Sequence, residues 1–275
     1  SSLTFEEESS GLLGRGFRCG FLGMLHLEIV TERLKREAGL QILLTSPSIV
    51  YKVTLKNGTT EEVYSAAKFP EVSEVVQVEE SWVTLKVLSP SDYVSPVMQL
   101  LYDHEGTVTS SETFKDGRVM LTIEMPLREL MRNFFDKLKN VSSGFASISY
   151  ELGEMRIADV VRLDLLVAEE EVPAFARVVA RRKVQDEAER AVEKLSGLLP
   201  KQLFVTKIQG KALGRILASQ TLSAIRKDVT GYLYGGDITR KMKLLEKQKK
   251  GKKRMKEQGK VHIPHEVFLK MVKAE

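Results

Sequence analysis

The sequence contains a single cysteine, Cys19, among 275 residues, so no disulfide can form within the chain. A reducing compartment is the natural setting for such a composition, and we expect a cytoplasmic protein. No apolar run approaches the roughly 20 residues that are needed to cross a bilayer. No charged-then-apolar signal segment opens the chain. The composition therefore predicts neither a membrane span nor export.

Sequence signatures of catalysis are missing as well. The phosphate-binding pattern G-x-x-x-x-G-K-[ST] does not occur, because the lysines after Gly210 and Gly251 are not followed by a hydroxyl residue that could hold magnesium. The four histidines are scattered, and the neighbouring His262 and His265 lack a third ligand at metal-site spacing. We predict no enzymatic activity, no cofactor, no metal and no small-molecule substrate for this chain.

Positive charge is concentrated in one segment. The chain is 43% hydrophobic and 29% charged, which is ordinary for a globular protein of about two domains. Its net charge of +5 hides an asymmetry: residues 240–260 hold eleven Lys or Arg and two Glu, a net +9, so the remainder sums to −4. A localised cationic stretch indicates a polyanionic partner, either nucleic acid or an anionic membrane.

Features within and beside this cationic stretch favour RNA. Tyr232 and Tyr234 precede it and can stack on unpaired bases. Its main apolar stripe, Met242 with Leu244 and Leu245, is too narrow for an amphipathic membrane anchor. Charge alone also permits an alternative to RNA binding, in which the stretch is only a solvated lysine face or a disordered tail. The candidate RNA-binding residues are Tyr232, Tyr234, Arg240, Lys241, Lys243, Lys247, Lys249, Lys250, Lys252, Lys253, Arg254 and Lys256.

The N-terminal region reads as strand, helix, strand, or half of a small α+β unit. Glycine-punctuated residues 14–23 lead into a helical pattern that Gly39 ends, and β-rich runs follow within residues 41–53. Residues 54–80 lack a sustained period and contain Asn57-Gly58, which predicts a tight turn. We interpret residues 54–80 as a linker with a hairpin.

From residue 81 the pattern becomes β-α-β-β-α-β, the order of the ferredoxin-like split unit. It predicts a four-stranded antiparallel sheet with two helices on one face. In the second helix Leu130, Phe134 and Leu138 share a face and should be buried. The expected strands are 82–88, 107–113, 119–125 and a run from 146, and the expected helices are 92–102 and 127–139.

The last region has the pattern of a further α+β domain. Its apolar periods predict several strands, one amphipathic helix that ends before Pro200, and a cationic helix with few apolar anchors. The expected strands are 160–167, 174–179, 204–208 and 215–219, and the expected amphipathic helix is 186–199.

Two longer sequence strings are more specific for a protein family than the hydrophobic periodicity is. They are LGRGFRCGFLGMLHLEI at residues 13–29, and YGGDITRKMKLLEKQK with GKKRMK at residues 234–256. Both closely resemble the LepA family of back-translocating elongation factors, which are translational GTPases. The FAS string at 145–147 and LPKQ at 199–202 also fit. The resemblance runs through the whole chain in order and is to the C-terminal part of the family.

The resemblance implies an α+β fold with ferredoxin-like split domains followed by a LepA-specific α+β domain. Residues 1–53 resemble the latter part of a ferredoxin-like domain shared with elongation factor G. Residues 54–80 correspond to a linker with a hairpin. Residues 81–168 resemble the last domain of elongation factor G. Residues 169–275 resemble the LepA-specific C-terminal domain with its basic RNA-binding tail. The domain of residues 1–53 would be incomplete, so we expect an exposed apolar surface or an unpaired strand edge in it.

The function that the resemblance implies is ribosome binding, with rRNA and tRNA as partners. Such a factor acts on tRNAs in the ribosome, in back-translocation or in translation fidelity or efficiency under stress. GTP and magnesium are expected only for a GTPase domain that this chain, which we interpret as a fragment, does not include. Weak peripheral association with the inner face of the cell membrane, and a generic RNA-binding module, stay open as alternatives.

Overall fold

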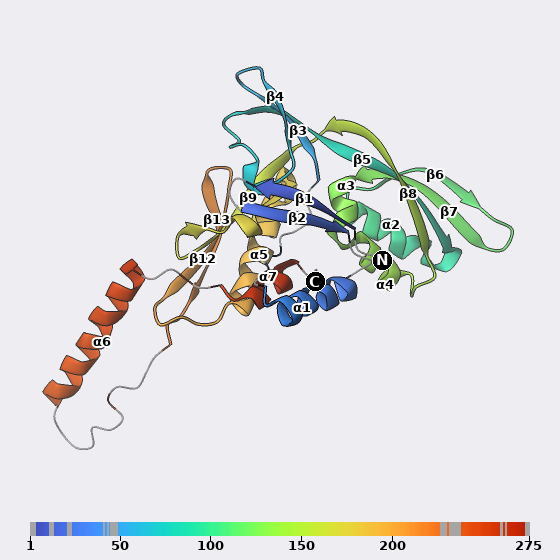
Figure 1. The fold of residues 1–275 in the computed structure, drawn as a ribbon. Helices are drawn as coiled ribbons and strands as arrows, with labels where there is room; N and C mark the ends of the chain where they lie inside the picture. Colours follow the sequence, from blue (N-terminus) through green and yellow to red (C-terminus); the bar gives the residue numbers. More distant parts are fainter. Residues whose placement is uncertain are drawn as a thin grey trace. The chain divides into compact units, whose positions relative to one another are not determined.

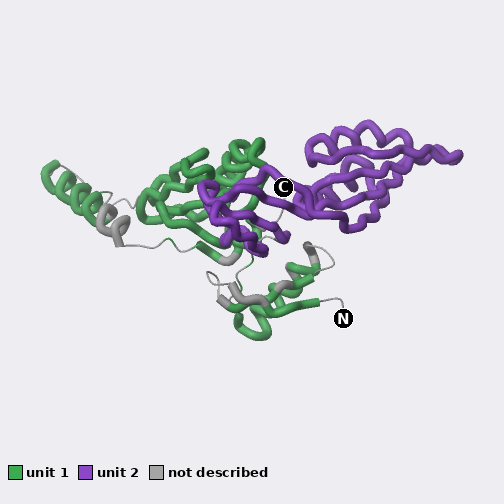
Figure 2. The backbone as a smooth tube through the Cα atoms, turned by 90° about the horizontal axis from the view of Figure 1, so that it is seen from above, with its two compact units in different colours: residues 1–46, 163–273 green, residues 47–162, 274–275 purple. Residues whose placement is uncertain are grey.

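The computed structural model describes residues 4–10, 14–20, 24–40, 42, 44, 49–225, 230, 238–258, 261 and 263–272. Helices alternate with antiparallel sheets along the chain, so the predicted α+β class is confirmed (Figure 1). The chain divides into two units (Figure 2). Unit 1 comprises residues 1–46 and 163–273, and unit 2 comprises residues 47–162 and 274–275.

Unit 2 is built around one long strand, β5 (Val75–Pro90). The second part of β5 pairs with β7 (Arg118–Pro126), which pairs with β6 (Thr107–Thr113). Strand β8 (Ser147–Ile157) pairs with the other edge of β5. The resulting order β8-β5-β7-β6 is antiparallel throughout and is that of the ferredoxin-like split unit, as the sequence predicts.

The first part of β5 carries a hairpin. It pairs with β3 (Tyr51–Leu55), which pairs in turn with β4 (Thr60–Val63). The tight turn predicted at Asn57-Gly58 is present: Gly58 has φ +82°, and the Asn57 side chain accepts the Thr59 N–H at 2.9 Å. The segment interpreted as a linker therefore holds β4, a 3-10 turn at Ala66–Lys68 and the start of β5.

Two helical segments cover one face of the unit 2 sheet. The first is η2 (Ser91–Tyr93) continued by α2 (Val94–Asp103). The second consists of α3 (Leu127–Glu129) and α4 (Phe135–Val141), joined by the irregular turn η3 (Leu130–Phe134).

The single helix predicted over residues 127–139 is wrong in one respect. Arg132 and Asn133 leave helical conformation, with φ +61° at Asn133. Asparagine tolerates this left-handed region better than most residues. The Arg132 guanidinium lies 3.1 Å from the Glu129 carboxylate, an i, i+3 ion pair at the kink.

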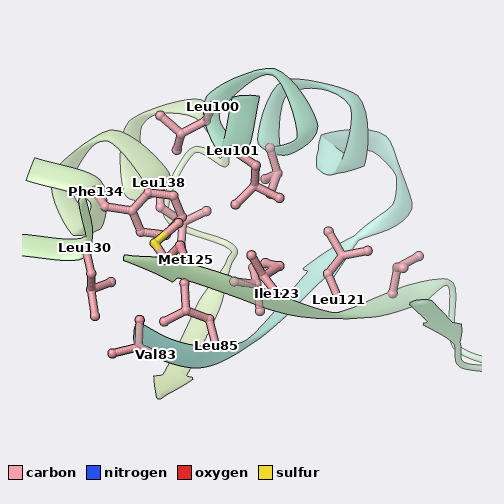
Figure 3. Close-up of a cluster of buried hydrophobic side chains, with 13 residues drawn as sticks. Val83, Leu85, Leu100, Leu101, Leu121, Ile123, Met125, Leu130, Phe134 and Leu138 are labelled. Atoms are coloured by element: carbon pink, nitrogen blue, oxygen red, sulfur yellow. The ribbon is translucent and has the colours of Figure 1, made fainter. Parts of the chain in front are cut away.

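The predicted core of unit 2 is confirmed. Leu130 and Phe134 are fully buried and Leu138 is 2% exposed. They pack on alternate residues of β5, including Val83 and Leu85 (Figure 3). This period of two is what a strand with one face on a core requires, and it places both helical segments on the same side of the sheet.

The C-terminal part of unit 1 contains a second sheet. Its strand order is β10-β9-β12-β13, and β11 also pairs with β9. The strands are β9 (Val160–Val167), β10 (Glu170–Glu171), β11 (Arg177–Ala180), β12 (Thr206–Ala212) and β13 (Arg215–Leu222).

The strand predicted over residues 174–179 is shorter than expected. Residues Pro173–Phe175 form a 3-10 turn, η4, and the strand starts only at Arg177. Proline fixes φ near −65° and cannot donate to a sheet, which explains the turn.

Helix α5 (Val184–Leu198) follows the 3-10 turn η5 (Arg181–Lys183) and packs on β12 and β13. The approach is close at Gly210, where an added Cβ would lie 3.1 Å from that of Ala188. Helix α7 (His265–Val272) packs on α5. The rings of Phe175 and Phe268 lie 4.9 Å apart between their centroids and complete this second core.

The N-terminal part of unit 1 is a hairpin followed by a helix. Strands β1 (Thr4–Ser10) and β2 (Gly14–Gly20) pair as a two-stranded sheet. Helix α1 (Met24–Ala38) ends at Gly39, as predicted, with φ +64°. Of the β-rich runs expected within residues 41–53, the first, at 42–45, is not a strand at the two residues that the structure describes there, 42 and 44.

Apolar rings are exposed on this N-terminal hairpin. Phe5 is 66% and Phe17 65% exposed, although their rings contact each other edge-to-face at 6.0 Å. The expectation of an exposed apolar surface in residues 1–53 is confirmed at these positions.

Candidate nucleic-acid interface

The cationic stretch forms one helix, α6 (Ile238–Gln258), as the sequence predicts. Its 21 residues include ten Lys or Arg and two Glu, a net +8. At 1.5 Å per residue the helix is about 30 Å long. Six of its ten cations fall within the last ten residues, where the negative end of the helix dipole favours positive charge.

Helix α6 differs from α2 and α5 in how little it buries. None of the side chains that the structure describes on it, which are those of residues 238–251, is buried. Ile238 is 73%, Met242 66% and Leu245 39% exposed, at helical spacings i, i+4 and i+7. This apolar stripe occupies only the first two turns. Because hydrophobic burial contributes little here, charge dominates what the helix can recognise.

The charges along α6 mostly repel one another. The described part of the helix has an attractive i, i+4 pair in Glu246 and Lys250, whose charged atoms lie 3.5 Å apart with both side chains exposed. Lys243 and Lys247, at the same spacing, are both exposed and destabilise the helix. A polyanion along the helix would relieve this repulsion.

The structure brings most of the predicted site residues onto α6. Arg240, Lys243, Lys247, Lys249 and Lys250 are exposed. Lys241 is half-buried, and Lys252, Lys253, Arg254 and Lys256 lie on the last turns of the same helix.

Tyr232 and Tyr234 lie outside the described residues. Their stacking role therefore stays a prediction.

Sequence reasoning missed a buried charged cluster in unit 2. Arg128 is only 10% exposed and donates to Glu80 at 2.9 Å, Glu105 at 2.6 Å and Glu129 at 2.6 Å. These residues lie on β5, after α2 and on α3, so no local motif indicates the cluster. His104, fully buried, places Nδ1 3.1 Å from the Glu129 carbonyl oxygen.

The pKa shifts in this cluster follow from burial and pairing. Burial raises the pKa of Glu80, and the charge and hydrogen bond of Arg128 offset that rise only in part. Burial alone would lower the pKa of Arg128, but the hydrogen bond to Glu105 and the three carboxylates together raise it. Burial, with the charge of Glu80, raises the pKa of Tyr51. The cluster ties β5, α3 and the α2–β6 turn together, and we assign it a structural role.

Membrane and metal features are sparse in the part of the chain that the structure describes. No helix there is long and apolar enough to span a bilayer. No three His, Cys, Asp or Glu side chains there are grouped as a metal site. That this chain binds neither metal nor guanine nucleotide stays a prediction.

The split unit with its appended sheet and basic helix defines a class, the C-terminal regions of translation elongation factors. Residues 77–166 match the family described as elongation factor G C-terminus, and residues 167–273 match the family described as GTP-binding protein LepA C-terminus. The chain belongs to the LepA family and corresponds to the C-terminal part of such a factor.

Two curated relatives illustrate the match. The chain is 46% identical over 275 residues to elongation factor 4 of Chlamydia abortus (strain DSM 27085 / S26/3) and 45% identical to that of Chlamydia pneumoniae. Each alignment covers all of this chain and 46% of the relative. The chain thus spans about half the length of these relatives.

Proposed function

We propose that this chain is the ribosome-binding portion of a LepA-type translation factor, and that α6 is its principal RNA contact. The observation that carries the proposal is the net charge of +8 on a helix whose described side chains are all at least partly exposed. Charge of this density attracts a polyanion. The kinship with elongation factors supports the ribosome as the source of that polyanion.

Binding would proceed by release of counterions. Lysines and arginines of α6 displace cations from rRNA or tRNA phosphates, so affinity falls as salt rises. If about six cations meet phosphate, the single-strand slope of about −0.7 per contact gives a loss of several hundredfold between about 50 and 200 mM salt. Exposed Lys249 and Lys250 stand next to Gly251, which has no side chain to hold an RNA backbone away.

In the whole factor this contact would serve work on tRNA in the ribosome, in back-translocation or in translation fidelity or efficiency under stress. GTP and magnesium would act in a GTPase domain. No residue of this chain is assigned to them, because the sequence has no phosphate-binding loop. The setting of the proposed function is the cytoplasm.

One observation favours a second candidate, which is peripheral binding to an anionic membrane. The exposed stripe of Ile238, Met242 and Leu245 could enter a bilayer interface. The stripe covers only about 10 Å of a helix about 30 Å long, and the strongly cationic half of α6 contains one further apolar residue, Met255. We therefore favour RNA.

Cosedimentation tests the proposal. The wild-type chain would be pelleted with ribosomes and, separately, with vesicles of phosphatidylserine and phosphatidylcholine. The variant replaces Lys249, Lys250, Lys252, Lys253 and Arg254 with glutamine. The matched control neutralises five exposed lysines of the folded regions, Lys35, Lys56, Lys68, Lys201 and Lys207.

We expect ribosome binding by the wild type and the control, and a loss of at least tenfold in affinity for the α6 variant. Pelleting with vesicles but not with ribosomes would overturn the proposal in favour of the membrane. Equal losses in the variant and the control would show that total charge, and not α6, carries the binding.

A further inference from the structure

A second aromatic feature lies in unit 2, away from α6 in the sequence. The ring of Phe145, in the loop between α4 and β8, stacks on the ring of Tyr93 in η2. The ring centroids are 5.8 Å apart and the planes differ by 25°. Tyr93 is half-buried, whereas Phe145 is 66% exposed. One face of Phe145 is therefore supported and much of the ring meets solvent.

The loop holds Phe145 in this position through its own backbone. The Gly144 N–H donates to the Lys139 carbonyl at 2.8 Å, and the Phe145 N–H donates to that of Ser142 at 2.9 Å. The buried Ser142 hydroxyl donates to the Leu138 carbonyl at 2.6 Å. Ser143 and Gly144 adopt left-handed conformations, with φ of +50° and +81°, as in a helix C-terminal cap.

The residues after Phe145 are anchored in the core, so the chain around this exposed ring is held in place. Ala146 packs against the unit 2 core, and Ile148, two residues further on, does the same. A large apolar ring that projects from an anchored loop loses the hydrophobic gain of burial, about 25 cal/mol per Å². Aromatic side chains contribute much of the binding energy of an interface when a partner buries them.

Cations lie on the segments that adjoin both rings. Lys137 and Lys139 are exposed on α4, just before the loop. On the other side the Ser91 N–H donates to the Gly117 carbonyl at 3.0 Å, which sets the β6–β7 turn with its exposed Lys115 next to η2. Exposed Asp92, Asp116 and Asp136 are acidic residues of the same segments, and Asp116 pairs with Arg118. Aromatic faces with lysines beside them are the combination that binds single-stranded nucleic acid.

We propose that Phe145 stacks an unpaired RNA base on its exposed face, with Tyr93 as the layer behind it and Lys139 and Lys115 near the adjoining phosphates. This inference rests on the proposed function, because the ribosome supplies the RNA. It adds a stacking site on a folded sheet domain to the electrostatic contact of α6. The two contacts differ in kind, since stacking releases few counterions and is nearly independent of salt.

The test compares three single variants of the full chain in ribosome binding at two salt concentrations. Phe145→Leu keeps an apolar side chain but loses the flat ring, and Phe145→Trp enlarges the ring. Tyr102→Leu is the matched control, because Tyr102 lies on α2 of the same unit and is 79% exposed. Both side chains are at the surface, so equal melting temperatures check that folding is intact.

We expect Phe145→Leu to weaken ribosome binding about fivefold to a hundredfold at both salt concentrations. Phe145→Trp should bind at least as well as wild type, and Tyr102→Leu should not differ from it. A photoreactive benzoylphenylalanine at position 145 should crosslink to RNA.

Each contrary result overturns a distinct claim. Phe145→Leu binding like wild type, or a crosslink to ribosomal protein alone, would overturn the stacking site and leave the proposed function standing. Failure of the wild type to bind ribosomes at low salt would overturn the proposed function, and the stacking inference with it.

Discussion

Arg128 of unit 2 and Lys250 of α6 hold positive charge in opposite surroundings. Arg128 in unit 2 is 10% exposed and each of its nitrogens meets a carboxylate, whereas Lys250 on α6 is 75% exposed and pairs with an exposed Glu246. A buried charge is tolerated only when it is paired. Lys243, Lys247, Lys249 and Lys250 of α6 are exposed, so an external polyanion can reach them. We therefore infer that the buried charge of Arg128 serves the fold, and we propose that the charge on α6 serves recognition.

The helices of the two regions differ in the same way. Leu130 and Phe134 are fully buried against the unit 2 sheet, while Met242 on α6 is 66% exposed. Most helical stability in proteins comes from packing an apolar face. We infer that changes in unit 2 alter stability first, and that changes on α6 alter binding first.

The largest effect on stability should come from Phe134→Ala. Removing this fully buried ring should cost about 3 to 5 kcal/mol in the free energy of unfolding. Met242→Ala on α6 is the matched apolar truncation and should cost less than about 0.5 kcal/mol. Urea unfolding monitored by circular dichroism measures both. A loss below about 1 kcal/mol for Phe134→Ala would show that the core is misassigned.

Arg128→Met should cost about 3 kcal/mol, because it leaves Glu80, Glu105 and Glu129 without their common partner. The cost should depend on pH. The folded-state pKa of Glu80 is raised, so the stability that it contributes is fully present below its unfolded pKa and is lost as pH rises through the folded pKa. Without Arg128 that pKa rises further, so the loss should be larger at pH 8 than at pH 5.

Glu80→Gln is the control for this pH dependence. It removes the carboxyl whose charged form burial disfavours, so the double variant with Arg128→Met should lose less of its stability between pH 5 and pH 8 than Arg128→Met alone. Equal losses at both pH values in the single Arg128 variant would contradict the assigned role of Glu80.

Replacing Gly210 or Gly251 with alanine should change stability in opposite directions. Gly210→Ala brings a methyl within 3.1 Å of Ala188 Cβ between β12 and α5, and such overpacking costs about 1 to 3 kcal/mol. At Gly251 on α6 an added Cβ would meet nothing within 4 Å. Gly251→Ala should therefore stabilise the helix by about 0.5 to 1 kcal/mol. Thermal unfolding and the far-ultraviolet signal separate the two effects. Stabilisation by Gly210→Ala would show that α5 is not tightly packed.

Sequence reasoning predicts elements well where local signals agree. Strand β6 has the predicted bounds, Thr107–Thr113, because Gly106 precedes it and Asp116-Gly117 turns the chain after it. The burial of Leu138 follows from helical spacing alone.

Features that no local pattern signals could not be predicted in this way. The kink at Asn133 breaks an amphipathic pattern that has no local interruption, and Arg128 meets Glu80 across 48 positions of sequence. The stack of Tyr93 and Phe145 joins the 3-10 turn η2 to the loop before β8, two segments about 50 residues apart in the sequence. The cationic segment was predictable because charge, unlike packing, is visible in composition.

The most direct test of the division between unit 2 and α6 is the salt dependence of ribosome binding. The logarithm of the association constant would be measured against the logarithm of salt concentration. The wild-type chain is compared with the variant in which Lys249, Lys250, Lys252, Lys253 and Arg254 are glutamine. We predict a slope of about −4 for the wild type and about −1 for the variant, with equal melting temperatures. Equal slopes and affinities would contradict the account and would place the RNA contacts on the folded domains.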